Sequence, residues 1–112
     1  MNHSTTHALL TTTVTAQTDI PANKLVGFDG KICGAGKKAL GVSNFDTAAK
    51  LPVGVAVFGL LRVIAGAAIE AGVEVGSDAQ GRVVPLTAEA KSNGYALDAA
   101  AEGEEVRIVR GI

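Results

Sequence analysis

Two histidines near the amino terminus have the spacing of a metal-binding pair. His3 and His7 lie four residues apart, which on a helix would place both imidazoles on one face, where they suit a transition metal. The serines and threonines around them disfavour a helix, and no third ligand is near. We therefore interpret the segment as a polar tail. Because both histidines fall within the first seven residues, no Ser/His/Asp set can be nominated, and we expect no enzyme.

A cluster of carboxylates near the carboxyl end is the second candidate for chemistry. It comprises Asp98, Glu102, Glu104 and Glu105, and hard cations such as calcium prefer several carboxylate ligands. The spacing lacks the alternating ligands of an EF-hand loop. We interpret the cluster as a solvated loop, and we expect neither a metal nor a cofactor.

Residues 34–38, Gly-Ala-Gly-Lys-Lys, invite comparison with a phosphate-binding loop. That motif requires glycine at position 31 and serine or threonine at position 38, and both positions are lysine. A surface turn is the better interpretation. The preceding Cys33 is the single cysteine, which excludes an intramolecular disulfide and suits a reducing compartment. We expect a buried or half-buried, unreactive thiol.

The composition predicts the fold that must position these groups. The 112 residues are 47% hydrophobic, yet they include only three Phe, one Tyr and no Trp, and 14 glycines separate runs rich in valine and isoleucine. Short β-forming runs between glycine turns are typical of a sandwich or barrel. We therefore predict an all-β protein, a compact small β-barrel or β-sandwich of short strands with an extended N-terminal arm.

The organisation follows from where the β-forming runs fall. We predict residues 1–12 to be a flexible or extended arm and residues 13–112 to be a single β-rich domain. The arm could add a strand to a neighbouring protein or simply fray. Strands are expected at residues 9–15, 24–28, 39–43, 53–59, 60–64, 73–75, 82–86, 95–97 and 106–109, with Gly59 as a bulge or turn, a hairpin turn at 78–81, and helical turns at 47–50 and 88–91.

Charge and hydropathy narrow the class of partner. Ten basic and eleven acidic residues leave a net charge of −1, with no basic stripe interleaved with aromatics, so we expect no direct contact with nucleic acid. The most apolar stretch, residues 51–73, contains Pro52, Arg62, Glu70 and four glycines. A bilayer span needs about 20 nearly uninterrupted apolar residues. We therefore expect no membrane segment, and the polar amino terminus predicts no export signal.

Two segments carry a resemblance to a known family. Residues 63–85 begin with Val-x-Ala-Gly-Ala-x-Ile-x-Ala-Gly and end in Ser-Asp-x-x-Gly-Arg-Val-Val-Pro, and residues 94–109 follow Gly-x-Ala-Leu-x-Ala-Ala with a later Val-x-Ile. Together, and more loosely with residues 14–41, they resemble the capsid cement or head decoration proteins of tailed bacteriophages.

The resemblance implies a structural protein assembled in the bacterial cytoplasm and carried on the outer surface of the virion. It implies binding to the major capsid protein of the expanded head, as homotrimers at three-fold or quasi-three-fold positions, which stabilises the head against internal DNA pressure. The alternative is a small-molecule or glycan-binding β-barrel of the adhesin type. Sugar sites commonly stack their ligands on aromatic rings, and only four such residues are available: Phe28, Phe45, Phe58 and Tyr95.

Six residues are candidates for contacts with the capsid or between subunits. Three lie in or next to the arm: Leu9, Leu10 and Val14. The others are charged: Arg62, Glu70 and Glu74. Arg62 lies between apolar neighbours, and two interpretations stay open. Its side chain either points to solvent or forms an intersubunit ion pair with Glu70 or Glu74.

Overall fold

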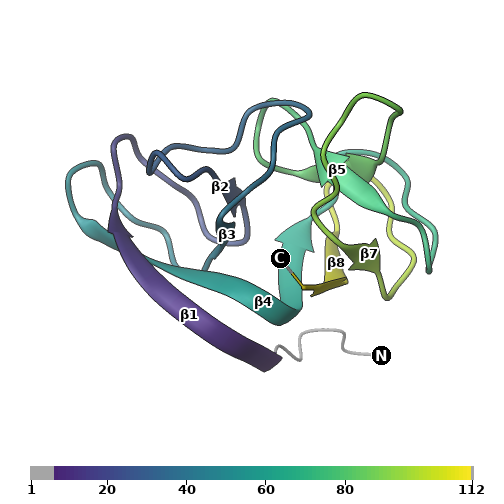
Figure 1. Ribbon diagram of the computed structural model, residues 1–112, viewed down its shortest axis with the longest axis horizontal. Helices are drawn as coiled ribbons and strands as arrows, with labels where there is room; N and C mark the ends of the chain where they lie inside the picture. Colours follow the sequence, from purple (N-terminus) through teal and green to yellow (C-terminus); the bar gives the residue numbers. More distant parts are fainter. Residues whose placement is uncertain (1–6, 112) are drawn as a thin grey trace.

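The computed structural model describes residues 7–111, which form eight β-strands and no helix, so the all-β prediction is confirmed. None of the described residues belongs to a helix that could cross a membrane. The strands are β1 (His7–Thr15), β2 (Leu25–Val26), β3 (Gly41–Ser43), β4 (Pro52–Ile64), β5 (Val75–Ser77), β6 (Val83–Pro85), β7 (Tyr95–Ala96) and β8 (Glu105–Arg110) (Figure 1).

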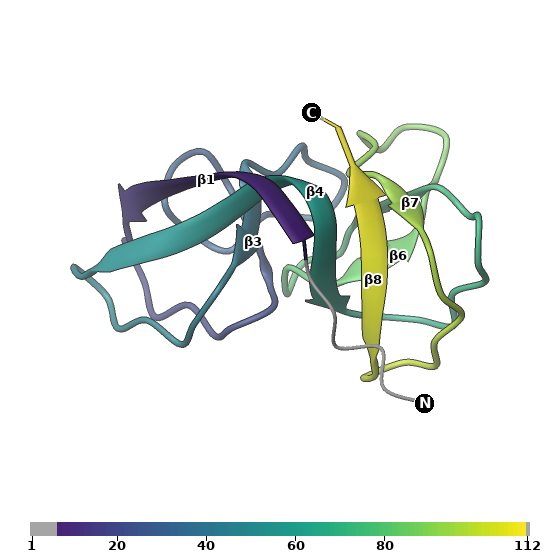
Figure 2. The ribbon, with the colours of Figure 1, turned by 90° about the horizontal axis from the view of Figure 1, so that it is seen from below.

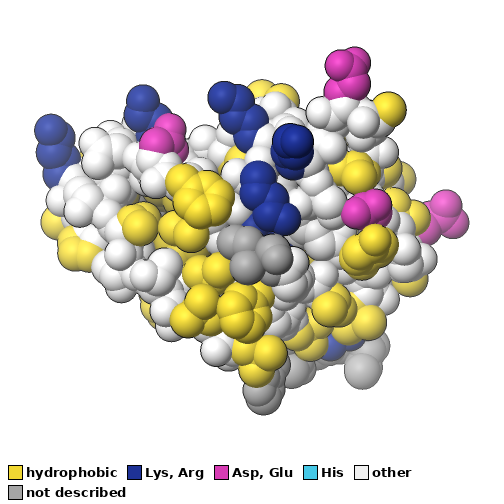
Figure 3. Space-filling model, in the orientation of Figure 1, with side chains coloured by type: hydrophobic (Ala, Val, Ile, Leu, Met, Phe, Trp, Pro, Cys, Tyr) yellow, Lys and Arg dark blue, Asp and Glu magenta, His cyan; other side chains and the backbone are white. Residues whose placement is uncertain are grey.

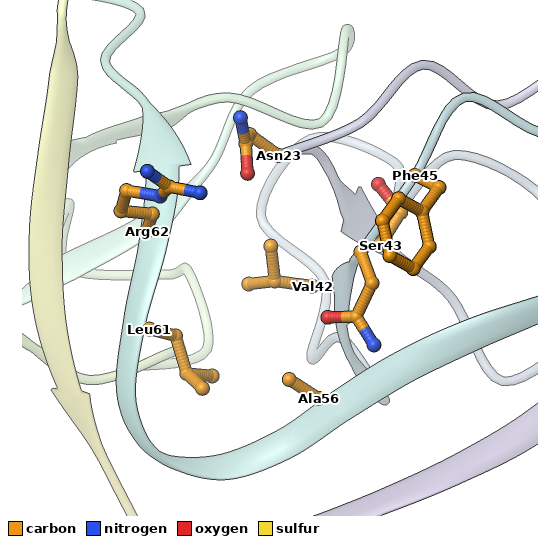
Figure 4. A pocket seen from close by; sticks show the side chains of 8 residues that line it. Asn23, Val42, Ser43, Phe45, Ala56, Leu61 and Arg62 are labelled. Carbon is orange, nitrogen blue, oxygen red and sulfur yellow. The ribbon is translucent and has the colours of Figure 1, made fainter. Parts of the chain in front are cut away.

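Strand β4 organises the molecule. It is 13 residues long, and it unites the two runs that the sequence predicted as separate strands at 53–59 and 60–64. At Gly59 it pairs with Ala8 of β1 on one side and with Arg110 of β8 on the other. Gly59 has a φ of 121°, a region that side-chain-bearing residues avoid. The strand turns sharply between Ala56 and Leu61, so the glycine accommodates a bend within one strand (Figure 4).

The bend divides the sheet into two lobes that share β4 (Figure 2). Strands β1 and β3 pair with the first half of β4, and β2 extends this lobe through β3. Strands β8 and β7 extend the second half, and the separate β5–β6 hairpin packs beside them.

The buried side chains form two groups, of which the larger joins the two lobes. The smaller group lies within the first lobe and contains Ala16, Ile20, Val26, Val53 and Val55. The larger group joins side chains of both lobes, including Val42 and Ala56 from the first and Leu61, Val106 and Ile108 from the second. The core is therefore continuous across the bend, and it is built of valine, isoleucine, leucine and alanine, as the composition predicts.

Strand β1 runs through the boundary that the sequence placed between residues 12 and 13. Residues 7–12 are extended and pair with β4 of the same chain, from His7 opposite Leu60 to Thr15 opposite Pro52. Residues 1–6 of the predicted arm lie outside the described part of the chain. Among the described residues β1 pairs only with β4, so its second edge is open, as expected of an edge strand.

The connections agree with the sequence in one place and differ in two. The β5–β6 hairpin closes over the predicted 78–81 turn, where the Asp78 carboxylate accepts the backbone N–H groups of Gln80 and Arg82, both at 2.9 Å. At the predicted helical turns, 47–50 and 88–91, the chain forms isolated turns rather than helix, with the Leu51 N–H bonded to Ala48 and the Ala90 N–H bonded to Thr87, both at 3.2 Å. The Lys50 N–H bonds to the Ala16 carbonyl at 2.7 Å, and the Lys91 N–H bonds to the Gly36 carbonyl at 2.9 Å, so distant segments take the donors with which a helix would continue.

Candidate interaction surfaces

The open edge of β1 combines exposed leucines with a run of threonines. The register with β4 shifts between Ala8 and Leu10 and again between Leu10 and Thr11, which leaves Leu9 without a partner residue. Leu9 is 69% exposed and Leu10 is 46% exposed. Residues 11–13, all threonine, are exposed as well. A bulge thus presents apolar side chains at an edge whose backbone groups are free to pair.

Val14 belongs to the interior rather than to this surface. It lies opposite Val53 in the β1–β4 ladder and packs against the smaller buried group. Of the three candidates on β1, Leu9 and Leu10 are exposed, whereas Val14 is partly buried and attaches the strand to its own core. Contact of these residues with a partner stays a prediction.

Arg62 lies beside a pocket in the bend of β4. The pocket has a volume of about 240 Å³, and its lining includes Asn23, Phe45, Ala56 and Arg62 (Figure 4). The guanidinium Nη1 is 4.0 Å from the Glu105 carboxylate, and the buried Nε has no hydrogen-bond partner among the described residues.

Glu70 and Glu74 take no part in that pair. Glu70 is exposed in the connection between β4 and β5, while Glu74 is partly buried and forms a bridge with Tyr95 through the backbone. The ion-pair partner of Arg62 within the chain is therefore Glu105. The sequence had placed Glu105 in the acidic cluster. The intersubunit pair with Glu70 or Glu74 stays a prediction.

The four carboxylates of the predicted acidic cluster have separate partners. Asp98 binds the Arg107 guanidinium through both oxygens, at 2.8 and 2.9 Å, and Glu105 faces Arg62. Glu102 lies 3.8 Å from Arg82, and Glu104 accepts the Ala101 N–H. The described residues contain no group of three His, Cys, Asp or Glu side chains placed to hold a metal. The predicted polar tail around His3 falls on residues 1–6, which lie outside the described part of the chain, whereas the backbone of His7 begins β1.

Cys33 is buried, as predicted. Its Sγ approaches the Lys37 carbonyl at 3.4 Å, and burial raises the pKa of the thiol above its ordinary value of 9.0, although a hydrogen bond from Ser77 and the charge of Arg110 act in the opposite direction. A thiol held neutral in this way is a poor nucleophile.

Sequence reasoning missed an apolar row on the second lobe. Tyr95 of β7 lies opposite Val109 of β8, which lies opposite Leu60 of β4. Directly opposed residues share a face of a sheet, and Tyr95 and Val109 are each about half exposed. Alternating polar and apolar residues in 105–108 could have indicated the faces of β8, but only the strand order brings Tyr95 and Leu60 to the same row.

The aromatic residues do not assemble into one platform. Phe28 lines a pocket in the loop that follows β2, Phe45 lines the pocket at the bend of β4, and Tyr95 lies on β7. Phe28 and Phe45 thus line different pockets.

Comparisons with known proteins identify a family for the sequence and a solved structure of similar fold. Residues 3–112 match the family model described as phage cement protein. The fold is similar to the crystal structure of the head fiber gp8.5 N base in bacteriophage phi29, with a TM-score of 0.77 and 22% sequence identity, over 91% of this chain and 93% of that chain. A search of curated proteins by sequence found no match.

Proposed function

The chain belongs to the phage cement protein family and is a structural protein of the phage capsid, and from this we propose that it binds the outer surface of the expanded head. Bound there, it holds neighbouring subunits of the major capsid protein together and stabilises the shell against the pressure of the packaged DNA. It assembles onto the head in the cytoplasm of the bacterial host. The phi29 protein of similar fold, named a head fiber base, is a further reason to place the chain on the head.

The open edge of β1 is the observation that carries this proposal. Natural proteins protect a long free edge with charged residues, proline, a bulge or a covering loop. The nine residues of β1 contain a bulge but no Asp, Glu, Lys, Arg or Pro. The exposed side chains of Leu9 and Leu10 lie at the bulge in this edge. An extended segment of the capsid protein could pair with such an edge and bury the leucines, which is the common mode of strand addition.

We further propose that three copies associate at three-fold or quasi-three-fold positions of the head. The charged candidates Arg62, Glu70 and Glu74 are assigned to contacts between copies. In this arrangement each copy contributes a small contact area, and the stabilisation of the head comes from repeating that contact at many equivalent positions.

The test mixes the purified protein with expanded heads that lack it and measures the protein that sediments with them. We expect the binding to be saturable. Images of the bound heads should show added density on the outer shell at three-fold positions. The double variant Leu9→Asp/Leu10→Asp should bind about ten-fold more weakly or worse, because carboxylates at a strand edge oppose pairing and the apolar contacts are lost.

Leu51→Asp is the matched control. Leu51 is also an exposed leucine, but it precedes β4 at the opposite end of the β1–β4 pair from Leu9, where Pro52 faces Thr15. The control should bind like the unmodified chain, and circular dichroism should show all three proteins folded. Failure of the unmodified chain to bind heads would overturn the proposal, and equal binding by the double variant would remove β1 from the contact.

A further inference from the structure

A pocket on the loop between β2 and β3 gathers three lysines beside an exposed phenylalanine. It has a volume of about 430 Å³, and its lining includes Lys31, Lys37, Lys38, Phe28 and Asp29. Figure 3 shows Lys and Arg side chains gathered over this loop, next to hydrophobic side chains. We refer to these five residues as the lysine pocket.

The lysine pocket has an excess of positive charge. Asp29 supplies its one carboxylate, and one oxygen of that carboxylate already accepts the Lys31 backbone N–H at 3.1 Å. The ion pairs among the described residues are made by Arg62, Arg82 and Arg107, and none involves Lys31, Lys37 or Lys38. The ammonium groups of Lys31 and Lys37 are therefore available to an outside partner.

A buried guanidinium behind the pocket adds to its positive field. Arg110 is 2% exposed and donates hydrogen bonds to the carbonyls of Ala39, Leu40 and Val57, with no carboxylate partner among the described residues. Burial, and then the charge of Arg110, lower the pKa of Lys38. The charge of Arg110 therefore acts on Lys38, a residue that lines the pocket.

The backbone that carries the lysines is held in place before any partner binds. The Lys37 carbonyl accepts a hydrogen bond from the side-chain amide of Asn93 at 3.0 Å, and the Asn93 oxygen accepts the Ala39 N–H at 2.9 Å. Asn93 is fully buried. Because Asn93 and Arg110 hold the backbone of residues 37–40, that backbone loses little conformational entropy on binding.

We propose that the lysine pocket binds an acidic segment of a capsid protein, one whose carboxylates flank an apolar side chain. The carboxylates would meet Lys31 and Lys37, and the apolar side chain would pack on Phe28, which is 62% exposed. This inference rests on the proposed capsid binding and adds a second contact, distinct from the edge of β1, that selects a partner by charge.

Charge complementarity favours a protein segment over nucleic acid as the occupant. A strand of DNA or RNA is held by a track of cations along its backbone, with several aromatic rings for its bases. The lysine pocket offers a compact group of cations and one ring, in a chain with a net charge of −1. Nucleic acid and free phosphate are therefore outcomes for the test to separate.

The experiment titrates the isotope-labelled full chain with a short oligoglutamate peptide and follows the backbone amide signals by NMR. We expect shifts concentrated in residues 27–38 that diminish as salt is raised, since exposed charges are screened over about 10 Å at 0.1 M salt. In Lys31→Gln/Lys37→Gln the apparent affinity should fall roughly five-fold. Lys24→Gln/Lys50→Gln removes the same charge from other loops and should leave the affinity unchanged.

Three results would overturn the proposal: shifts outside residues 27–38, equal shifts in the Lys31/Lys37 variant, or equal or larger shifts with inorganic phosphate or oligothymidylate. Sedimentation with heads separates the two proposals. If the Lys31/Lys37 variant binds heads like the unmodified chain at every salt concentration, the pocket is not a contact although capsid binding stands. If the unmodified chain binds no heads, capsid binding fails and the acidic segment loses its capsid source.

Discussion

Arg110 is the largest fully buried side chain, and it is charged. It ends β8, where the buried residues Val106 and Ile108 share its alternation, so the strand directs the guanidinium into the interior. Three backbone carbonyls accept its hydrogen bonds, and burial lowers the pKa of the group. A cation buried without a carboxylate costs free energy, which is offset here by fixing β4 and residues 39–40 to the carboxyl end of the chain.

We predict that Arg110→Met lowers the free energy of unfolding by about 3 kcal/mol in urea denaturation. The substitution removes the donor of three buried carbonyls, and the cost of leaving them unpaired exceeds the gain from no longer burying a charge. Arg62→Met is the control, since that side chain is one third exposed and its ion pair spans 4.0 Å. The control should change stability by less than about 1 kcal/mol. If Arg110→Met is as stable as the unmodified chain, the buried guanidinium is not a structural anchor.

At this scale the sequence predicts some residues well and others poorly. A single cysteine among apolar runs is correctly expected to be buried. Arg107 and Arg110 look equivalent in the sequence, yet Arg107 binds Asp98 near the surface while Arg110 enters the core. Side chains of a strand point alternately to its two faces, so Arg110 is predicted to point inward with Val106 and Ile108, and Arg107 to point outward. Its carbonyl partners lie in β4 and in the residues before β3, all more than 50 residues away in the sequence, so they could not be predicted.

The bend of β4 is the element that decides the architecture. Gly59 lies in the left-handed half of the φ range, at 121°, where a β-carbon is strained. We predict that Gly59→Ala destabilises the fold by roughly 1–3 kcal/mol, measured by urea denaturation. Gly111→Ala is the matched control, because its φ is ordinary and an added β-carbon meets no atom within 4 Å. Equal stability of the two variants would show that the bend does not depend on glycine.

Strand positions were predictable because glycine turns separate most of the β-forming runs. The sequence locates β3, β5, β6, β7 and β8 to within a few residues, and it identifies Gly59 as special. It divides β4 in two because a glycine between apolar runs favours a turn. The structure retains one strand, since β1 and β8 pair with it from opposite sides at that residue and hold the backbone extended through the bend.

At the scale of the whole molecule, the two lobes share both a strand and a core. β4 contributes Val53 and Val55 to the smaller buried group and Leu61 and Val63 to the larger one. Loss of order in either lobe therefore removes partners from β4 and exposes side chains of the other. We infer that residues 13–112 unfold as one cooperative unit, in which neither lobe has an independent stability.

Tyr95, the one tyrosine in a chain without tryptophan, makes this inference testable because it lies on β7 in the second lobe. We predict that Val53→Ala, in the first lobe, lowers the free energy of unfolding by about 2 kcal/mol through the cavity it leaves. The urea transition reported by Tyr95 fluorescence should move as far as the transition reported by circular dichroism. The exposed control Thr13→Ala should shift both by less than about 0.5 kcal/mol. A Tyr95 transition that stays in place while the circular dichroism splits would mean that the lobes are separable, and that a capsid contact on β1 could not stabilise the second lobe.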